Sequence, residues 1–269
     1  MCYGKNVFDL FKKRRRAAVR AEPMPEAWRR ILDANVPYVS ALSAADRTKL
    51  EELVRVFLDE KRFEGCGGLT VTEEMRVTIA AQACLLLLHR ESDIYPGLDS
   101  ILVYPHAYRA HASRRSGGVV MDVDDVRLGE SWVQGTLVLA WDHVRCATHH
   151  VSPGQNVVLH EFAHQLDAED GSMDGAPKLE SRARYATWAR VLGEEFADLT
   201  ERIHAGRDGD IDPYGATSPP EFFAVVTEMF FERPHELRSR HASLYAELAA
   251  FYGQDPATVI DAFRSSASE

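Results

Sequence analysis

Cysteine is scarce in this sequence and scattered along it. The 269 residues include four cysteines, no two of which form a C-x-x-C pair: Cys2, Cys66, Cys84 and Cys146. A thiolate zinc knuckle and a dense disulfide scaffold are therefore not indicated. This cysteine usage predicts a protein of the reducing cytoplasm.

Long apolar runs are also missing. The leucine-rich run Cys84–Leu88 is far too short to span a bilayer, so we expect no membrane span. The basic run Lys12–Arg16 is followed by AAVRAEPMPEAW rather than by the apolar core of a signal peptide, and export is therefore not expected. We interpret residues 1–22 as a flexible, solvated basic tail in preference to a membrane or partner anchor.

A surplus of positive charge is the third absence. The sequence has 41 acidic and 31 basic residues, which gives a formal net charge of −10. Without an excess of cations to displace the counterions of phosphate groups, broad binding to DNA or RNA is disfavoured. We therefore expect no direct nucleic-acid partner.

Helical patterns fill most of residues 23–92. A first helix is predicted around Glu26–Asn35, a second from Ser43, where Ser-Ala-Ala-Asp offers a capping box, and a third over Thr72–His89. This part of the chain is predicted to be a mainly helical N-terminal third.

Residues 93–269 combine short strands with further helices. Strands are predicted in 101–105, 117–123 and 135–144, and later helices over 179–202 and from Pro219. The order helices, sheet, helices predicts an α+β fold with a small mixed sheet rather than βαβ units. No long linker is visible, so we expect residues 23–269 to form a single unit.

The last of these strands, in residues 135–144, has two interpretations. It either provides a sheet edge to which an extended peptide adds through main-chain hydrogen bonds, or it is an ordinary buried strand. The sequence leaves both open.

Two histidines four residues apart flank a glutamate in His160-Glu161-Phe162-Ala163-His164, an H-E-x-x-H pattern. On a helix, residues i and i+4 share a face, so both imidazoles reach one ion while Glu161 reaches a water bound to it. Zinc suits these ligands, and a catalytic zinc keeps three protein ligands and one open position. Glu161 is the candidate general base.

The surroundings of the motif predict a helix that is packed into the domain. Most neighbouring residues are apolar, and Ser152, Pro153 and Gln155 form a helix-start signal just before it. The alternative, two core histidines beside a solvent-facing glutamate, fits this frame less well. His149 and His150 are interpreted as loop residues.

A third ligand is needed, and several downstream acids are candidates. They are Asp170 in the loop after the motif, Glu194 and Glu195 on the next helix, and Glu221 and Glu228 on the helix that begins at Pro219. The helix that begins at Pro219 is rich in apolar residues, and a carboxylate on such a helix is unusual unless it is paired or bound to a metal. This modestly favours Glu221. Glu228, seven residues on, is either a ligand or a carboxylate that orients an imidazole.

Four segments carry a family resemblance: LGESW at 128–132, LVLAW at 137–141, VVLHEFAHQLD at 157–167 and DPYGATSPPEFFAVVTEMFF at 212–231. They resemble the Mlc titration factor A family of zinc peptidases, over most of the chain from about Trp28. The active site of that family is in turn similar to the peptidase domain of anthrax lethal factor, a zincin.

The resemblance implies a zincin-like metallopeptidase fold with one Zn²⁺ per chain, held by His160, His164 and Glu221. It implies that Tyr214, seven residues before Glu221, assists catalysis, and that Glu228 supports a ligand. The implied activity is zinc-dependent hydrolysis of peptide or protein substrates, aminopeptidase-like in some members. It also implies an alternative, a regulatory protein that sequesters a transcriptional repressor of the Mlc type, with catalysis secondary.

Overall fold

The computed structural model describes residues 3–106, 108–116, 119–127, 129–132, 135–148 and 155–266; for 3–9, 108–132, 147–148 and 266 only the backbone is described. The α-helices are α1 (Tyr3–Ala21), α2 (Glu26–Asn35), α3 (Tyr38–Ala41), α4 (Ala44–Glu60), α5 (Glu73–Leu85), α6 (Trp141–Thr148), α7 (Val157–Asp167), α8 (Arg182–His204), α9 (Pro219–Glu232), α10 (Pro234–Arg240), α11 (Ala242–Tyr252) and α12 (Pro256–Ser266). Two 3₁₀ helices are η1 (Ala168–Asp170) and η2 (Pro213–Thr217). The strands are β1 (Arg62–Gly65), β2 (Ser100–Tyr104), β3 (Tyr108–Ser116), β4 (Val119–Arg127), β5 (Gly129–Trp132) and β6 (Thr136–Ala140).

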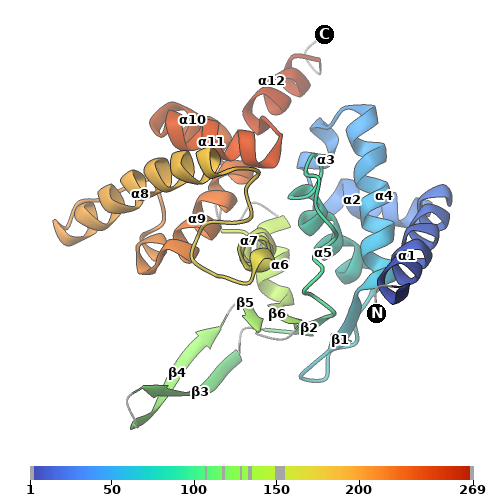
Figure 1. Ribbon diagram of the computed structural model, residues 1–269, viewed down its shortest axis with the longest axis horizontal. Helices are drawn as coiled ribbons and strands as arrows, with labels where there is room; N and C mark the ends of the chain where they lie inside the picture. The colour runs from blue at the N-terminus through green and yellow to red at the C-terminus, as the bar shows by residue number, and fades with distance from the viewer. Residues whose placement is uncertain are drawn as a thin grey trace.

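The main sheet is small and mixed, as the sequence predicts. Its strand order is β1-β2-β6-β5, where β1, β2 and β6 run parallel and β5 is antiparallel to β6. β3 and β4 form a separate antiparallel pair. The predicted α+β class is confirmed, with helices dominating the fold (Figure 1).

The prediction that βαβ units are absent is wrong. β1, α5 and β2 form one, because β1 and β2 are parallel neighbours and α5 connects them. The sequence does not predict β1, because RFEG is four residues long, contains one large apolar side chain and is largely exposed. Such a short outer strand carries no alternating apolar pattern.

β6 is an interior strand, so the interpretation of residues 135–144 as a peptide-binding edge is wrong. It pairs with β2 on one side and β5 on the other. Its run Leu137–Ala140 is almost fully buried, as expected for a strand covered on both faces. The strand also ends at Ala140, and the chain continues as α6 from Trp141.

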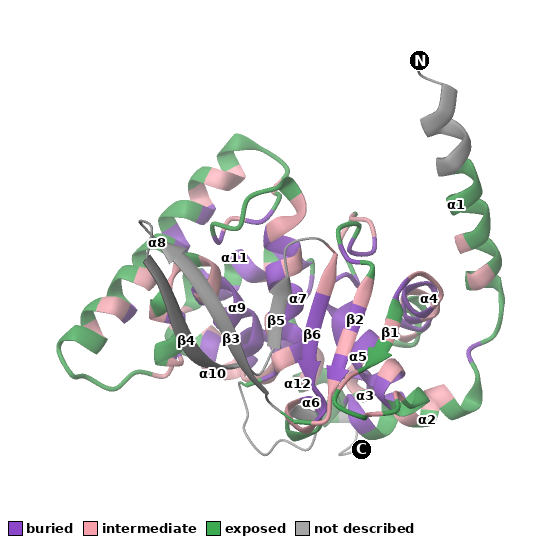
Figure 2. Ribbon diagram, turned by 90° about the horizontal axis from the view of Figure 1, so that it is seen from below, coloured by how far each residue is buried: buried purple, intermediate pink, exposed green. Residues whose placement is uncertain are grey.

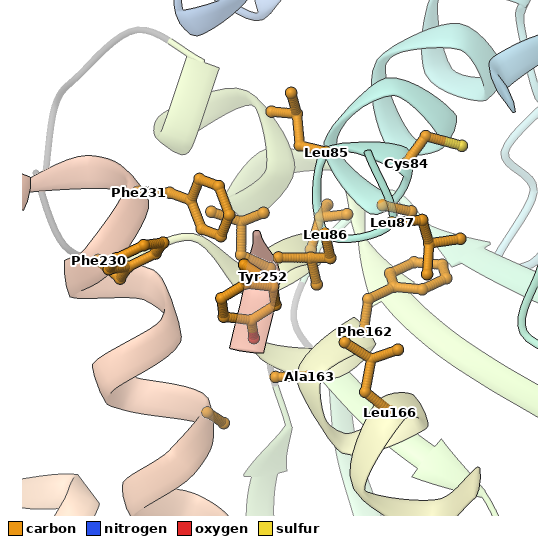
Figure 3. Packing of buried hydrophobic residues seen from close by; sticks show 14 of the residues in the cluster. Cys84, Leu85, Leu86, Leu87, Phe162, Ala163, Leu166, Phe230, Phe231 and Tyr252 are labelled. Atoms are coloured by element: carbon orange, nitrogen blue, oxygen red, sulfur yellow. The ribbon is translucent and has the colours of Figure 1, made fainter. Parts of the chain in front are cut away.

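α7 runs through the middle of the molecule, between the N-terminal helices and the C-terminal helices (Figure 1). It contacts α5, α9, β5 and β6. Phe162 is fully buried, with its ring centroid 4.7 Å from that of Tyr95 and 5.7 Å from that of Phe57. Figure 3 shows Phe162, Ala163 and Leu166 among apolar side chains from several elements. The helix that carries the histidine motif is therefore fixed by packing on several sides.

The basic N-terminal segment is a helix with paired charges along the side that faces α4. Arg15 lies 2.7 Å from Asp59, and the guanidinium of Arg16 donates to both carboxylate oxygens of Glu60, at 2.6 and 2.7 Å. Residues 10–21 are therefore solvated, as predicted, but they form a helix paired with α4 rather than a flexible tail. Charge runs in a sequence do not reveal which acids will lie opposite them. Figure 2 shows the described part of α1 as a largely exposed helix beside α4.

Along the stretches that the structure describes, no helix combines the length and apolar character needed to cross a membrane. Cys66, Cys84 and Cys146 are free thiols.

His241, between α10 and α11, joins three parts of the C-terminal half. Its Nδ1 lies 2.6 Å from Glu195 of α8, and its Nε2 lies 3.0 Å from Asp210 in the loop that leads to η2. The contact with Glu195 raises the pKa of His241, against an opposing effect of burial. Arg240 also lies near Asp210, at 3.8 Å.

We expect the stabilisation from His241 to depend on pH. Because the pKa of His241 is raised in the folded protein, the stabilisation is fully present below the pKa of the unfolded state, about 6.5. The stabilisation is lost as pH rises through the pKa of the folded state. His241→Gln should therefore reduce the free energy of unfolding by about 1.5–3 kcal/mol near pH 6 and by less near pH 9. Urea denaturation across this range measures it, with exposed His204→Gln as the control. An equal loss at both pH values would contradict the charged bridge.

Candidate metal centre

Asn156 starts the motif helix. Its side-chain oxygen accepts hydrogen bonds from the backbone N–H groups of Val158 and Leu159, at 3.1 Å each. The sequence places the start at Ser152-Pro153, but these residues lie outside the described ones, and α7 begins at Val157. Asparagine directly before an apolar helical run is a recognised start signal, so the sequence did contain the correct cap.

The structure brings His160, His164 and Glu221 together. The two imidazoles follow each other by one turn of α7, with ring centroids 4.9 Å apart. Glu221 comes from the first turn of α9, where the Ser218 hydroxyl caps its N–H at 3.4 Å. Its Oε2 lies 3.0 Å from His160 Nε2 and 3.4 Å from His164 Nε2. One ligand atom from each side chain lies within 4.8 Å of the others, a spacing at which three groups can share one metal ion.

Glu228 orients the first imidazole. It lies two turns after Glu221 on α9, and its Oε1 is 2.7 Å from His160 Nδ1. Its other oxygen accepts a hydrogen bond from the backbone N–H of Asn156. With Nδ1 engaged in this way, the Nε2 atom of His160 faces Glu221. This arrangement, an imidazole with a carboxylate behind it, is typical of metal-binding histidines.

The charges at the site favour a cation. Burial lowers the pKa of His160, but its contacts with Glu221 and Glu228 outweigh burial and raise that pKa to about 10. For Glu221, burial is outweighed by the contacts with His160 and His164, and its pKa falls to about 2. A proton on His160 therefore balances the negative charge of Glu221 and Glu228. A divalent cation bound at the same place would balance that charge in the same way.

Glu161 lies beside this cluster without joining it. Its side chain is 5% exposed, and among the described residues no partner is found for its Oε2 atom. Burial raises its pKa to about 7, assisted by the negative charges of Glu221 and Glu228 and opposed by His160. A carboxyl group with this pKa both takes up and releases a proton near neutral pH.

Tyr214 stands at the surface next to the cluster. It belongs to η2, where the carboxylate of Asp212 accepts a hydrogen bond from its backbone N–H at 2.9 Å. Tyr214 is 54% exposed, and its ring centroid lies 6.0 Å from that of His160. Tyr214, which the sequence analysis assigns to catalysis, therefore lies beside the His160 imidazole and is accessible to a ligand.

The other candidate ligands lie elsewhere. Asp170 accepts hydrogen bonds from Ser172 in its own turn, Glu194 pairs with Arg190 on the surface of α8, and Glu195 contacts His241. His149 and His150 lie outside the described residues. Within the part of the chain whose side chains are described, His160, His164 and Glu221 are the group with metal-ligand spacing.

Comparison with known proteins agrees with this geometry. Residues 10–253 match the sequence model of the glucose-regulated metallo-peptidase M90 family. An uncharacterized protein from Synechocystis is 44% identical over 236 residues, which cover 87% of this chain and 86% of that protein. Mlc titration factor A from Klebsiella pneumoniae is 31% identical over 82% of this chain and 84% of its own length, and the Yersinia pestis protein is 29% identical over 87% of each. The resemblance carried by the four sequence segments is confirmed.

Proposed function

Because the chain belongs to the glucose-regulated metallo-peptidase M90 family, we propose that it is a zinc-dependent peptidase whose metal ligands are His160, His164 and Glu221. The observation that carries the proposal is one carboxylate oxygen of Glu221 at 3.0 and 3.4 Å from two imidazole nitrogens. Two imidazoles and a carboxylate are a ligand set that suits zinc, with one position left for water or substrate. The proposal includes a zincin-like fold, with α7 as the active-site helix.

Zinc bound to these three side chains would supply a Lewis acid and a water of lowered pKa. Glu161 takes the proton from the attacking water and passes it to the leaving amine. Its buried position, its pKa of about 7 and an Oε2 atom without a hydrogen-bond partner among the described side chains suit both steps. Glu228 holds His160 in the orientation that keeps Nε2 towards the metal position.

Tyr214 is proposed to stabilise the oxyanion that forms when water attacks the carbonyl group. Its place beside His160 and its exposure support this role. A hydroxyl donor of this kind contributes about 3 kcal/mol, a hundredfold or more in rate.

The substrate is proposed to be a peptide in extended form. With β6 enclosed, the described sheet has two outer strands, β1 and β5, and we propose β5 for peptide addition because it contacts α7. Aminopeptidase-like cleavage and a cytoplasmic location belong to the same proposal, and the free thiols are consistent with the latter.

Removal of the metal tests the proposal directly. Treatment with a chelator is expected to reduce cleavage of a peptide library to background, and about one equivalent of zinc per chain should restore it. Zinc content is measured by atomic emission on the same samples. A fully active protein without metal would disprove the proposed chemistry.

A second function is supported by the name that the Klebsiella and Yersinia relatives share, Mlc titration factor A. The chain would then bind a transcriptional repressor, with peptide cleavage secondary. A variant that lacks cleavage but keeps the fold separates the two functions, since repressor binding would survive in it.

A further inference from the structure

The loop between α7 and α8 contacts the start of α9 through Gly175. Asp167, the last residue of α7, is fully buried, and its Oδ2 accepts a hydrogen bond from the backbone N–H of Gly175 at 2.9 Å. On its other side, the carbonyl of Gly175 accepts from the indole N–H of Trp188 at 2.9 Å. Trp188 is also buried, at 1% exposure. Two buried side chains thus hold the backbone of Gly175 from both sides.

Gly175 presses against the first residue of α9. Its φ angle is +81°, and a Cβ atom at this position would lie 2.6 Å from the carbonyl oxygen of Pro219 and 2.7 Å from its carbonyl carbon. Side-chain atoms do not approach backbone so closely, so the contact exists because residue 175 has no side chain. Pro219 precedes Glu221 by two residues.

We propose that Asp167, Gly175 and Trp188 form a clamp that positions Glu221 for metal binding. The inference rests on the proposed function, since Glu221 matters here as a ligand. Asp167 follows His164 by three residues on α7, so the clamp sets the distance between the helix that carries the histidines and the helix that carries the carboxylate.

The clamp is expected to transmit a displacement towards Glu221. Asp167 and Trp188 are buried, whereas Pro219 is exposed, so the start of α9 is the side that yields to an added methyl group. Metal–ligand distances tolerate changes of only about 0.2 Å. A shift of α9 by several tenths of an ångström therefore weakens the metal site without altering any ligand.

Gly175→Ala tests the clamp, with Gly171→Ala as the matched control. Gly171 also has a positive φ angle, +93°, but a Cβ there meets nothing within 4 Å. Both variants place an alanine at a positive φ angle, and of the two only Gly175→Ala pushes on Pro219. We expect Gly175→Ala to bind zinc about 10- to 100-fold more weakly than Gly171→Ala in a chelator competition assay. Equal affinities of the two folded variants would overturn the clamp.

A second pair of variants covers the case in which Gly175→Ala does not fold. Asp167→Asn keeps an acceptor oxygen for the Gly175 N–H, whereas Asp167→Ala removes it. Zinc affinity should fall about tenfold or more in Asp167→Ala and stay near wild type in Asp167→Asn. Equal affinities in this pair would also overturn the clamp. A wild-type protein that binds no zinc would instead overturn the proposed function, a result distinguishable from failure of the clamp alone.

Discussion

Replacement of Glu161 by glutamine is expected to lower the rate of peptide cleavage by about 10²- to 10⁴-fold while zinc content stays near one per chain. Glutamine has nearly the same shape, so the packing of α7 is kept, but it cannot take a proton from water. The carboxylate is not within the ligand group, so metal binding should not need it. Peptide cleavage and zinc content, measured on one preparation, check both halves of the prediction.

The control is Glu194→Gln, which makes the same change on the surface of α8, where the side chain is 66% exposed. It should cleave at the wild-type rate. Unchanged turnover in Glu161→Gln would refute the role of Glu161 as the base. The same variant addresses the regulatory alternative, because a protein that sequesters a repressor should still bind it after the base is lost.

Truncation of Glu221 to alanine is expected to remove most of the bound zinc. A structural zinc site contributes roughly 10–16 kcal/mol through its full ligand set, so one ligand accounts for about 4 kcal/mol, or roughly a thousandfold in affinity. His160 and His164 would remain as a pair that holds zinc weakly. Titration with zinc against a competing chelator gives the affinity.

Glu194→Ala is the matched control for Glu221→Ala, since it removes a carboxylate that sequence reasoning also considered as a ligand. Its zinc affinity should equal that of the wild type. If Glu194→Ala lost zinc while Glu221→Ala kept it, the ligand would lie on α8 and the assignment to α9 would be wrong. Thermal unfolding without metal shows that both variants are folded.

The motif helix and the shared face of its two histidines could be predicted from sequence because they depend on local spacing. His160 and His164 share a helix face at any place in any fold, and the apolar residues between them indicate a buried helix. The choice of Glu221 among several acids depended instead on family resemblance. Local pattern cannot tell that Glu195 meets His241, a contact between positions 46 residues apart.

The errors in the sheet have the same origin. β1 is too short to show a pattern of apolar residues. Its partner β2 comes after α5 in the sequence, so the pairing joins distant segments. The apolar run Leu137–Ala140 indicates a buried strand, but the sequence does not indicate which strands pair with it. The charges of α1 likewise found partners on α4 that no local rule identifies. Contacts between distant segments decide these features.

Asn156 helps to hold the two helices of the proposed metal site together in the absence of a metal. Its backbone N–H reaches Glu228 and its side-chain amide donates to Glu232 at 3.0 Å, so the start of α7 is tied to the last turns of α9. Asp167 and Gly175 tie the opposite ends of the same two helices. A pair of helices fastened at both ends has little freedom to separate, so the ligands are already close before a cation arrives. Loading then requires the loss of a proton and of bound water rather than a folding step, and the empty protein should keep its secondary structure through repeated cycles of metal loss and uptake.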